Sequence, residues 1–180
     1  MISLAKNIQH LFVTDDGSLP DIYVENLNRE KFEKIVEHCL TSWSNENTIL
    51  AWDNELNKEV KLRQSEFFKK FFNAQLSVRP IHLDKANING TTLPQLNMFI
   101  YGPAPAEIEN IIFDYRMGKD WTEKTILCIL EFFALILDIA PNAKVFRAPE
   151  GYHDSPNIEF TDTLNKYYDD TRKEKLNAPL

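Results

Sequence analysis

Apolar and polar positions alternate near the start of the chain in the manner of paired strands. From Pro20 to Asn26 the alternation places Ile22 and Val24 on one side of an extended segment. The stretch from Asn7 to Val13 is also apolar, and Asp15 to Ser18 follow it as a tight turn, because Asp and Gly tolerate the backbone angles that turns need. The pattern predicts that the two stretches pair as one hairpin.

A helical spacing begins directly after this segment. Asn28 stands where a helix N-cap belongs, and charged residues then occupy one side of the following stretch. Apolar residues recur at intervals of three and four on the other side: Phe32, Ile35, Val36, Cys39, Leu40 and Trp43. The spacing predicts an amphipathic helix from Asn28 to Trp43.

Shorter elements follow in the middle of the chain. Thr48 to Trp52 and Glu59 to Leu62 predict a second hairpin around a polar loop. Ser65 is expected to cap a short helix that carries Phe67, Phe68, Phe71 and Phe72. Their helical spacing favours core packing over base stacking beside Lys69 and Lys70. Leu76 to Leu83 reads as extended, with Pro80 indicating an edge or a bulge.

The strongest strand patterns lie from Gln95 to Tyr101 and from Ile108 to Tyr115, with a Pro-rich link between them. These two strands are expected to form the centre of the sheet. A helix from Trp121 to Ile139 follows, apolar on nearly every side, and Asp120 with Glu123 resembles a capping arrangement for it. Such a helix has to be covered by a sheet and by other elements or a partner.

The final part of the chain shows a weaker pattern. Gly151 to Pro156 is typical of a loop, and Phe160 to Asp170 predicts one more amphipathic helix. Apolar residues make up 43% of the chain and charged residues 26%, which is ordinary globular usage. The sequence predicts a single α+β domain over residues 1–170, a mainly antiparallel sheet packed against two principal helices, with residues 171–180 as a mobile tail.

Charge and cysteine content narrow the functional classes. The net charge of -7 disfavours binding to nucleic acid, which requires clustered cations, and favours a basic partner. Cys39 and Cys128 lie in helical patterns without the spacing of a zinc site, so we expect two reduced, buried thiols. The first residues lack the long apolar run of a signal peptide, and Ile126 to Ile139 is too short and too charged for a membrane span. A cytoplasmic location without membrane insertion is the expectation.

Catalytic motifs are sparse. The chain has no nucleophile elbow, and its five glycines form no phosphate or dinucleotide loop, so no nucleotide cofactor is expected. The four histidines fall in separate predicted elements. An enzymatic alternative stays open, in which a small hydrolase-like site is assembled from His82, Asp84 and Asp114.

Acidic residues gather around the predicted turns. An ordinary solvated surface is one interpretation of this clustering. The other is a docking surface for a basic protein, where complementary charge speeds encounter and a few aromatic residues anchor the complex. The residues predicted for such a surface are Asp15, Asp16, Tyr23, Trp52, Asp53, Glu55, Tyr101, Glu107 and Glu109.

Two blocks of the sequence carry a family resemblance. The runs FVTDDGSLPDIYVENL and DYRMGKDW, with the strand LPQLNMFIYG between them, resemble small bacterial immunity proteins encoded beside polymorphic or contact-dependent growth-inhibition toxins. The resemblance implies a cytoplasmic, non-enzymatic protein that binds one cognate toxin domain and blocks its active site or its activation. It assigns no individual contact residue, and it does not extend beyond Pro149.

The leading hypothesis from the sequence is therefore an immunity protein that neutralises its toxin by steric occlusion. The hydrolase-like enzyme is one alternative. Another is a regulatory subunit that forms a homodimer through the apolar helix from Trp121 to Ile139.

Overall fold

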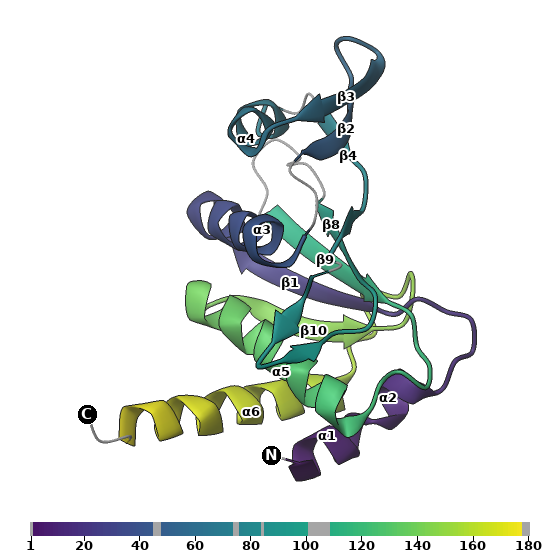
Figure 1. Cartoon of the computed structure of the whole chain (residues 1–180), viewed down its shortest axis with the longest axis vertical. Coiled ribbons are helices and arrows are strands. Elements are labelled where there is room, and N and C mark those ends of the chain that lie inside the picture. Colours follow the sequence, from purple (N-terminus) through teal and green to yellow (C-terminus); the bar gives the residue numbers. More distant parts are fainter. Residues whose placement is uncertain (1, 45–47, 74–75, 84, 101–108, 178–180) are drawn as a thin grey trace.

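A five-stranded antiparallel sheet organises the computed structural model, which describes residues 2–44, 48–73, 76–83, 85–100 and 109–177 (Figure 1). The strand order is β10-β1-β9-β8-β5, so β9 is the central strand, next to β8 as predicted. All neighbouring strands run antiparallel. The strands are β1 (Asp21–Leu27), β5 (Ile81–His82), β8 (Leu96–Ile100), β9 (Glu109–Tyr115) and β10 (Lys144–Ala148). The predicted α+β class is confirmed.

Helices cover one face of this sheet. The helix α5 (Glu123–Ile139) packs against α3 (Arg29–Trp43), α1 (Ile2–Ile8) and α6 (Ile158–Asn177). Helix α3 contacts β1 and β9 of the sheet, and helix α6 contacts β10. Asn28 caps α3 by accepting a hydrogen bond from the backbone nitrogen of Lys31 at 2.9 Å, as the sequence predicts.

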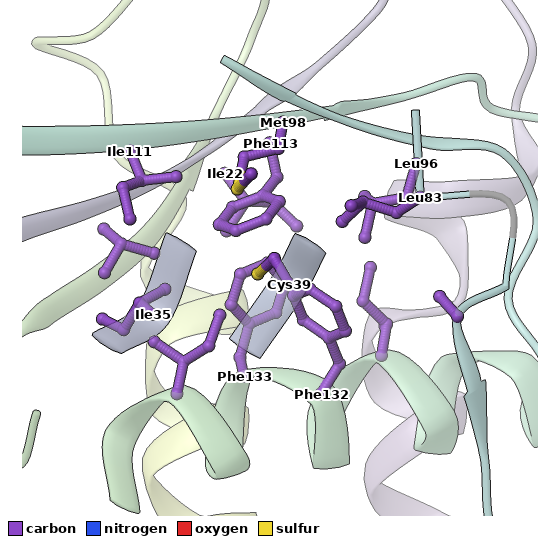
Figure 2. Close-up of a cluster of buried hydrophobic side chains, with 14 of the residues drawn as sticks. Ile22, Ile35, Cys39, Leu83, Leu96, Met98, Ile111, Phe113, Phe132 and Phe133 are labelled. Carbon is purple, nitrogen blue, oxygen red and sulfur yellow. The ribbon is translucent and has the colours of Figure 1, made fainter. Parts of the chain in front are cut away.

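The main core fills the space between these helices and the sheet (Figure 2). Apolar side chains of the sheet point toward Phe132 and Phe133 of α5, and α3 adds Ile35 and Cys39. Phe113 meets both Phe132 and Phe133 edge to face, at ring separations of 5.3 and 5.4 Å. The sheet residues labelled in Figure 2 are Ile22, Leu96, Met98, Ile111 and Phe113, and Leu83, also labelled, directly follows β5. Both cysteines are free and buried, as expected.

A smaller three-stranded sheet lies at one end of the long axis (Figure 1). It contains β2 (Ile49–Asp53), β3 (Lys58–Leu62) and β4 (Leu76–Val78), with α4 (Gln64–Phe71) packed against β4. The predicted second hairpin is confirmed as β2 and β3. Phe71 of α4 stacks on Phe32 of α3 at 5.5 Å, so this sheet joins the main core. A two-stranded hairpin, β6 (Asn87–Ile88) and β7 (Thr91–Thr92), packs on α5.

The predicted first hairpin is wrong. Residues 2–13 form α1 and α2 (His10–Val13), and β1 pairs with β10 and β9. The buried residues of this segment follow a helical spacing, and α1 packs on α5 and α6: Leu4, Ala5, Ile8, Leu11 and Phe12. The turn itself is present, since Gly17 and Ser18 donate backbone hydrogen bonds to the carboxylates of Asp15 and Asp16.

Two helix starts differ from their predictions. The N-cap of α5 is Thr122, whose backbone nitrogen donates to Thr125 Oγ1 at 2.7 Å, so Asp120 and Glu123 do not form the cap. Trp121 precedes the helix and is buried, with its indole nitrogen donating to the carbonyl of Arg116. The N-cap of α4 is Arg63, two residues before Ser65.

The last helix is longer than predicted. It continues through Asn177, and Arg172 pairs with Asp138 of α5, so residues 171–177 belong to α6. Its Phe160, Leu164 and Tyr167 pack into the main core. The helix α5 is covered by α1, α3, α6 and the small hairpin, and its exposed side chains are Lys124 and Asp138. Its apolar side chains are buried or partly buried within the chain. None of the described helices has the length and apolar character that a membrane crossing requires.

Candidate functional site: the open face of the sheet

The face of the five-stranded sheet opposite the helices carries the candidate site. Strand alternation directs every second side chain to this open face, and in the described part of the chain no helix packs on it. Its apolar members form a cluster separate from the main core. The open face therefore displays side chains that the fold does not need for its principal core.

Four polar side chains lie side by side across four strands of this face. His82 of β5 pairs with Asn97 of β8, Asn97 with Asp114 of β9, and Asp114 with Asp21 of β1. We call His82, Asn97, Asp114 and Asp21 the polar row. Directly opposed residues in antiparallel strands bring their side chains into contact, so the sheet register itself assembles this row.

Hydrogen bonds connect the members of the polar row. Asn97 Oδ1 lies 2.6 Å from His82 Nδ1, and because an amide oxygen only accepts, the imidazole proton is on Nδ1. Asn97 Nδ2 donates to Asp114 Oδ1, also at 2.6 Å. At the other end, the hydroxyl of Tyr23 donates to Asp21 Oδ2 at 3.1 Å. The amide of Asn97 thus couples a histidine to a buried carboxyl group.

Burial sets the protonation of the two carboxyl groups. Asp114 is only 6% exposed, and desolvation raises its pKa. The hydrogen bond from Asn97 opposes this rise, whereas the nearby charges of Asp21 and Glu150 add to it. Desolvation likewise raises the pKa of Asp21, with the Glu150 charge acting in the same direction. The pair therefore holds protons more strongly than exposed aspartates do.

An apolar row runs beside the polar row. Phe99 of β8 pairs with Ile112 of β9, Ile112 with Tyr23 of β1, and Tyr23 with Phe146 of β10. We call Phe99, Ile112, Tyr23 and Phe146 the apolar row. Tyr23 and Phe146 stack at 5.1 Å, while Ile112 and Phe99 remain partly exposed. An apolar strip bordered by polar groups is the usual layout of a protein-binding surface.

The two sequence blocks meet at the end of the sheet beside the polar row. Phe12 stacks on Tyr115 at 4.9 Å and lies 5.0 Å from Trp121, and its carbonyl accepts from the backbone nitrogen of Gly118. Gly118 adopts a φ of +146°, which favours glycine. The blocks that carry the family resemblance are therefore one structural unit.

The buried side chain of Arg147 holds this unit together by hydrogen bonds. Arg147 Nε donates to Tyr115 Oη at 2.6 Å, and both Arg147 and Tyr115 donate to the carbonyl of Leu11. Burial raises the pKa of Tyr115 to about 12, so its hydroxyl keeps its proton. These bonds hold α2 and the adjoining loop against the end of the sheet.

The loops that leave this end of the sheet enclose a surface pocket of about 440 Å³. Asp15 lies on one wall, with its carboxylate 4.0 Å from the position that a Cβ on Gly118 would take. The pocket lining carries two carboxylates, Asp15 and Asp120, and two cations, Arg116 and Lys119. Further carboxylates lie at the same end of the sheet: Asp16 next to Asp15, and Asp21 and Glu150 near Asp114. We call this region the acidic end of the open face.

The structure separates the predicted docking residues into two groups. Asp15 and Asp16 lie at the acidic end, exposed, and Tyr23 belongs to the apolar row but is only 7% exposed. Trp52 and Glu55 lie on the β2–β3 hairpin of the smaller sheet, at one end of the long axis, whereas α1 and α2 occupy the other (Figure 1). The side chain of Glu109, at the start of β9, and all of Tyr101 and Glu107 fall outside the described residues. The two groups therefore do not form one continuous patch.

The prediction that Asp53 is a docking charge is wrong. Its side chain is 1% exposed and accepts from the backbone nitrogens of Glu55 and Leu56 and from Lys70 Nζ, at 2.6 Å. The hydrogen bond from Lys70 is the largest cause of its lowered pKa. Asp53 shapes the hairpin loop, beside which Trp52 is 44% exposed.

The structure describes two of the three residues that were predicted for an enzymatic site. His82 and Asp114 do come together, joined through Asn97, while Asp84 lies outside the described residues. Sequence reasoning missed Asn97, the position of Asp21 beside Asp114, and the effect of the Glu150 charge on both carboxyl groups. The alternation of β8 and β9 placed Asn97 and Asp114 on the face away from the core, but pairing register was needed to make them neighbours.

Metal-binding groups and similarity to known proteins were the two remaining sources of evidence on function. Within the described ranges, no group of three or more His, Cys, Asp and Glu side chains is arranged to hold a metal ion. Comparison of the chain with protein-family models, with curated proteins and with solved structures finds no match. Function is therefore argued from the geometry of the open face.

Proposed function

We propose that this chain is a binding protein that docks a basic protein domain on the open face of its sheet. Following the sequence resemblance, we propose that the partner is a cognate bacterial toxin domain, neutralised because the docked chain occludes its active site or activation surface. The observation that carries the proposal is the open face itself, where an apolar row lies directly beside a polar row and the acidic end.

Packing supports a binding role for this face. The helices bury the opposite face of the sheet, so the fold already has a complete core without the apolar row. Ile112 and Phe99 remain partly exposed in the middle of a rigid sheet. A surface on paired strands is preorganised, so a partner does not have to order it on binding.

Charge supports a basic partner. The chain carries a net charge of -7, and carboxylates predominate at the acidic end. Two carboxyl groups that are partly desolvated, Asp21 and Asp114, gain most from a cation placed against them. Complementary charge of this kind mainly raises the association rate and excludes acidic competitors.

The direct test is calorimetric titration of the purified chain against the product of the gene beside its own. Growth of cells that make this product is measured with and without the chain. We expect 1:1 binding and loss of toxicity. Absence of both binding and protection would reject the immunity function.

A pair of matched double variants locates the docking surface. Asp15→Lys with Asp16→Lys should slow association about tenfold at low salt and much less at high salt, because the exposed charges act over about a Debye length. The control, Asp162→Lys with Asp169→Lys, makes the same change of charge on exposed positions of α6. Equal slowing by both variants would show that net charge, and not the acidic end, governs encounter.

One observation favours an enzymatic alternative. The chain His82–Asn97–Asp114 places a carboxyl group with raised pKa on the same face as a histidine that Asn97 orients, so that an acid and a base are both held in fixed positions. Screening the chain against ester, phosphoester and glycoside substrates tests this alternative. Hydrolysis that Asp114→Asn abolishes, while the variant keeps the unfolding midpoint, would establish it; activity unchanged in Asp114→Asn would exclude this site as its source.

A further inference from the structure

Residues 149–156, which we call the strap, connect β10 to α6 and run over the open face along β1. The strap is anchored where the backbone nitrogen of Leu19 donates to Glu150 Oε2 at 3.0 Å and where Asn157 donates to the carbonyl of Arg147 at 2.7 Å. Between these anchors it contacts both ends of β1. The Gly151 backbone lies close enough to the Asp21 carboxylate to act against the rise in its pKa, and His153 contacts Glu25.

The strap covers half of the apolar row. The His153 ring lies edge-on to Tyr23 at 4.9 Å and edge-on to Phe146 at 5.5 Å. Tyr23 is therefore 7% exposed and Phe146 2%, although both side chains point to the open face, while Ile112 and Phe99 are left partly exposed. A partner that docks on the whole apolar row has to displace the strap.

His153 joins the strap to β1 through one ring nitrogen and bonds to a neighbour within the strap through the other. Nε2 lies 2.5 Å from Glu25 Oε1 and Nδ1 lies 3.1 Å from Asp154 Oδ1. Carboxylates only accept hydrogen bonds, so a ring that bonds to both has to carry a proton on each nitrogen. The closed strap therefore contains the charged form of His153.

We infer that His153 is a proton-controlled clasp, which keeps the strap closed over Tyr23 and Phe146 while its ring is charged and releases them to the docking face when the ring is neutral. The consequence for docking rests on the function proposed above; the clasp itself is a property of the free chain. The charged groups that face it are Glu25 and Asp21 of β1, Lys144 of β10, whose Nζ lies 4.4 Å from the Phe146 ring centre, and Glu150 and Asp154 of the strap.

The direction of the pH dependence follows from these neighbours. The hydrogen bond that His153 donates to Glu25, followed by the one that it donates to Asp154, raises the pKa of His153 above the ordinary value of 6.5. A histidine whose pKa is raised in the closed state stabilises that state at low pH and loses the contribution as pH rises through the raised value. The clasp is expected to open on the alkaline side of pH 6.5.

The test is an NMR titration of the free chain from about pH 5.5 to about pH 8.5, the range in which histidine changes charge. We expect the His153 ring, the Gly151 and Tyr152 amides and the Tyr23 ring to share one transition with a midpoint above 6.5. After correction for the intrinsic rate, amide exchange in the strap should become several-fold faster across this transition. A His153 midpoint at or below 6.5, or strap amides that do not follow it, would overturn the proposal.

Variants separate the clasp from a general effect of pH. Glu25→Gln should lower the midpoint and loosen the strap at low pH, while His153→Phe should keep the ring contacts and abolish the transition. His10→Gln is the matched control, because His10 also pairs with a glutamate, Glu159 of α6 at 3.2 Å, and belongs to α2 and not to the strap. If His153→Phe leaves the strap transition intact, another group controls it and the clasp is rejected.

Measuring the affinity for the partner as a function of pH is a separate experiment from the titration of the free chain. If the proposed toxin binds, its affinity should rise across the same transition in the wild-type chain and should stay level in His153→Phe. Affinity that is level in both would show that docking does not require the strap to open. Failure of any partner to bind would reject the proposed function, whereas the titration of the free chain still decides the clasp.

Discussion

The two faces of the five-stranded sheet are made by the same strands but differ in what their side chains do. On the covered face, Ile22, Ile111 and Phe113 are fully buried against α3 and α5. On the open face, the alternate residues Asp21, Ile112 and Asp114 contact one another, the strap or solvent. One face is a core and the other is a surface held in place by that core.

Polar groups show the difference most clearly. On the covered face, Tyr115 and Arg147 satisfy each other and the carbonyl of Leu11. On the open face, Asp114 is buried to a similar degree, but its burial raises its pKa and two carboxyl neighbours add to the rise. Groups that serve the fold are satisfied within the chain, whereas the open face retains charge in an unfavourable setting, as binding surfaces commonly do.

The largest expected contrast is between two phenylalanines. Phe113→Ala should lower the free energy of unfolding by about 3–5 kcal/mol, because it leaves a cavity between the sheet and Phe132 and Phe133. Phe99→Ala, on the open face, should cost about 1 kcal/mol, since the side chain is already partly exposed. Urea denaturation of both variants measures the contrast. Equal losses would mean that the open face is part of the core.

A smaller contrast is expected between two tyrosine hydroxyls. Tyr115→Phe should cost about 2 kcal/mol, because Arg147 Nε then loses its acceptor in a buried site. Tyr23→Phe removes a hydroxyl that donates to Asp21, whose side chain is half-buried, and should cost about 0.5–1 kcal/mol. Thermal and urea unfolding compare the two. A greater loss in Tyr23→Phe would reverse the assignment of the two faces.

The smallest effect is a difference in pH dependence between two aspartates. Because the pKa of Asp114 is raised in the folded chain, ionisation weakens the fold as pH rises through that value, and Asp114→Asn should remove this loss. The pKa of Asp53 is lowered, so its contribution is present above the unfolded pKa and is lost as pH falls through the folded one.

Urea midpoints measured from acid to neutral pH check the two signs. Asp114→Asn should be as stable as the wild type or slightly more stable at neutral pH, by well under about 1 kcal/mol. Asp53→Asn should be less stable at neutral pH and should approach the wild type in acid. Loss of stability at neutral pH in Asp114→Asn would show that its charge serves the fold.

Local sequence patterns correctly predicted the elements in which the buried residues recur at one clear helical or strand spacing. The spacing from Phe32 to Trp43 and the N-cap Asn28 specified α3, and the apolar stretches at β8 and β9 specified two neighbouring strands. Residues 7–13 were misassigned as a strand because a short apolar segment does not distinguish the helical period from the strand period. Their helical state is stabilised by packing on α5 and α6, which local propensity does not contain.

The site was predicted less well than the fold. Asp15, Asp16, His82 and Asp114 were singled out for their chemistry, and three chain segments do bring them to one end of the open face. Asn97 carried no signal of its own, since an isolated asparagine in a strand has no distinguishing spacing. Asp53 was misassigned because a turn aspartate looks the same in sequence whether it faces solvent or binds a lysine from another element.

The sequence by itself determined the α+β class, the amphipathic α3, the covered apolar helix α5 and the alternation of β1, because these depend on residues close together in the chain. Only the tertiary structure decided that β1 lies between β9 and β10, that Asn97 links His82 to Asp114, and that His153 lies over Tyr23 and Phe146. Strand register and long-range packing bring residues together from distant parts of the chain. A single sequence carries no local signal for such contacts.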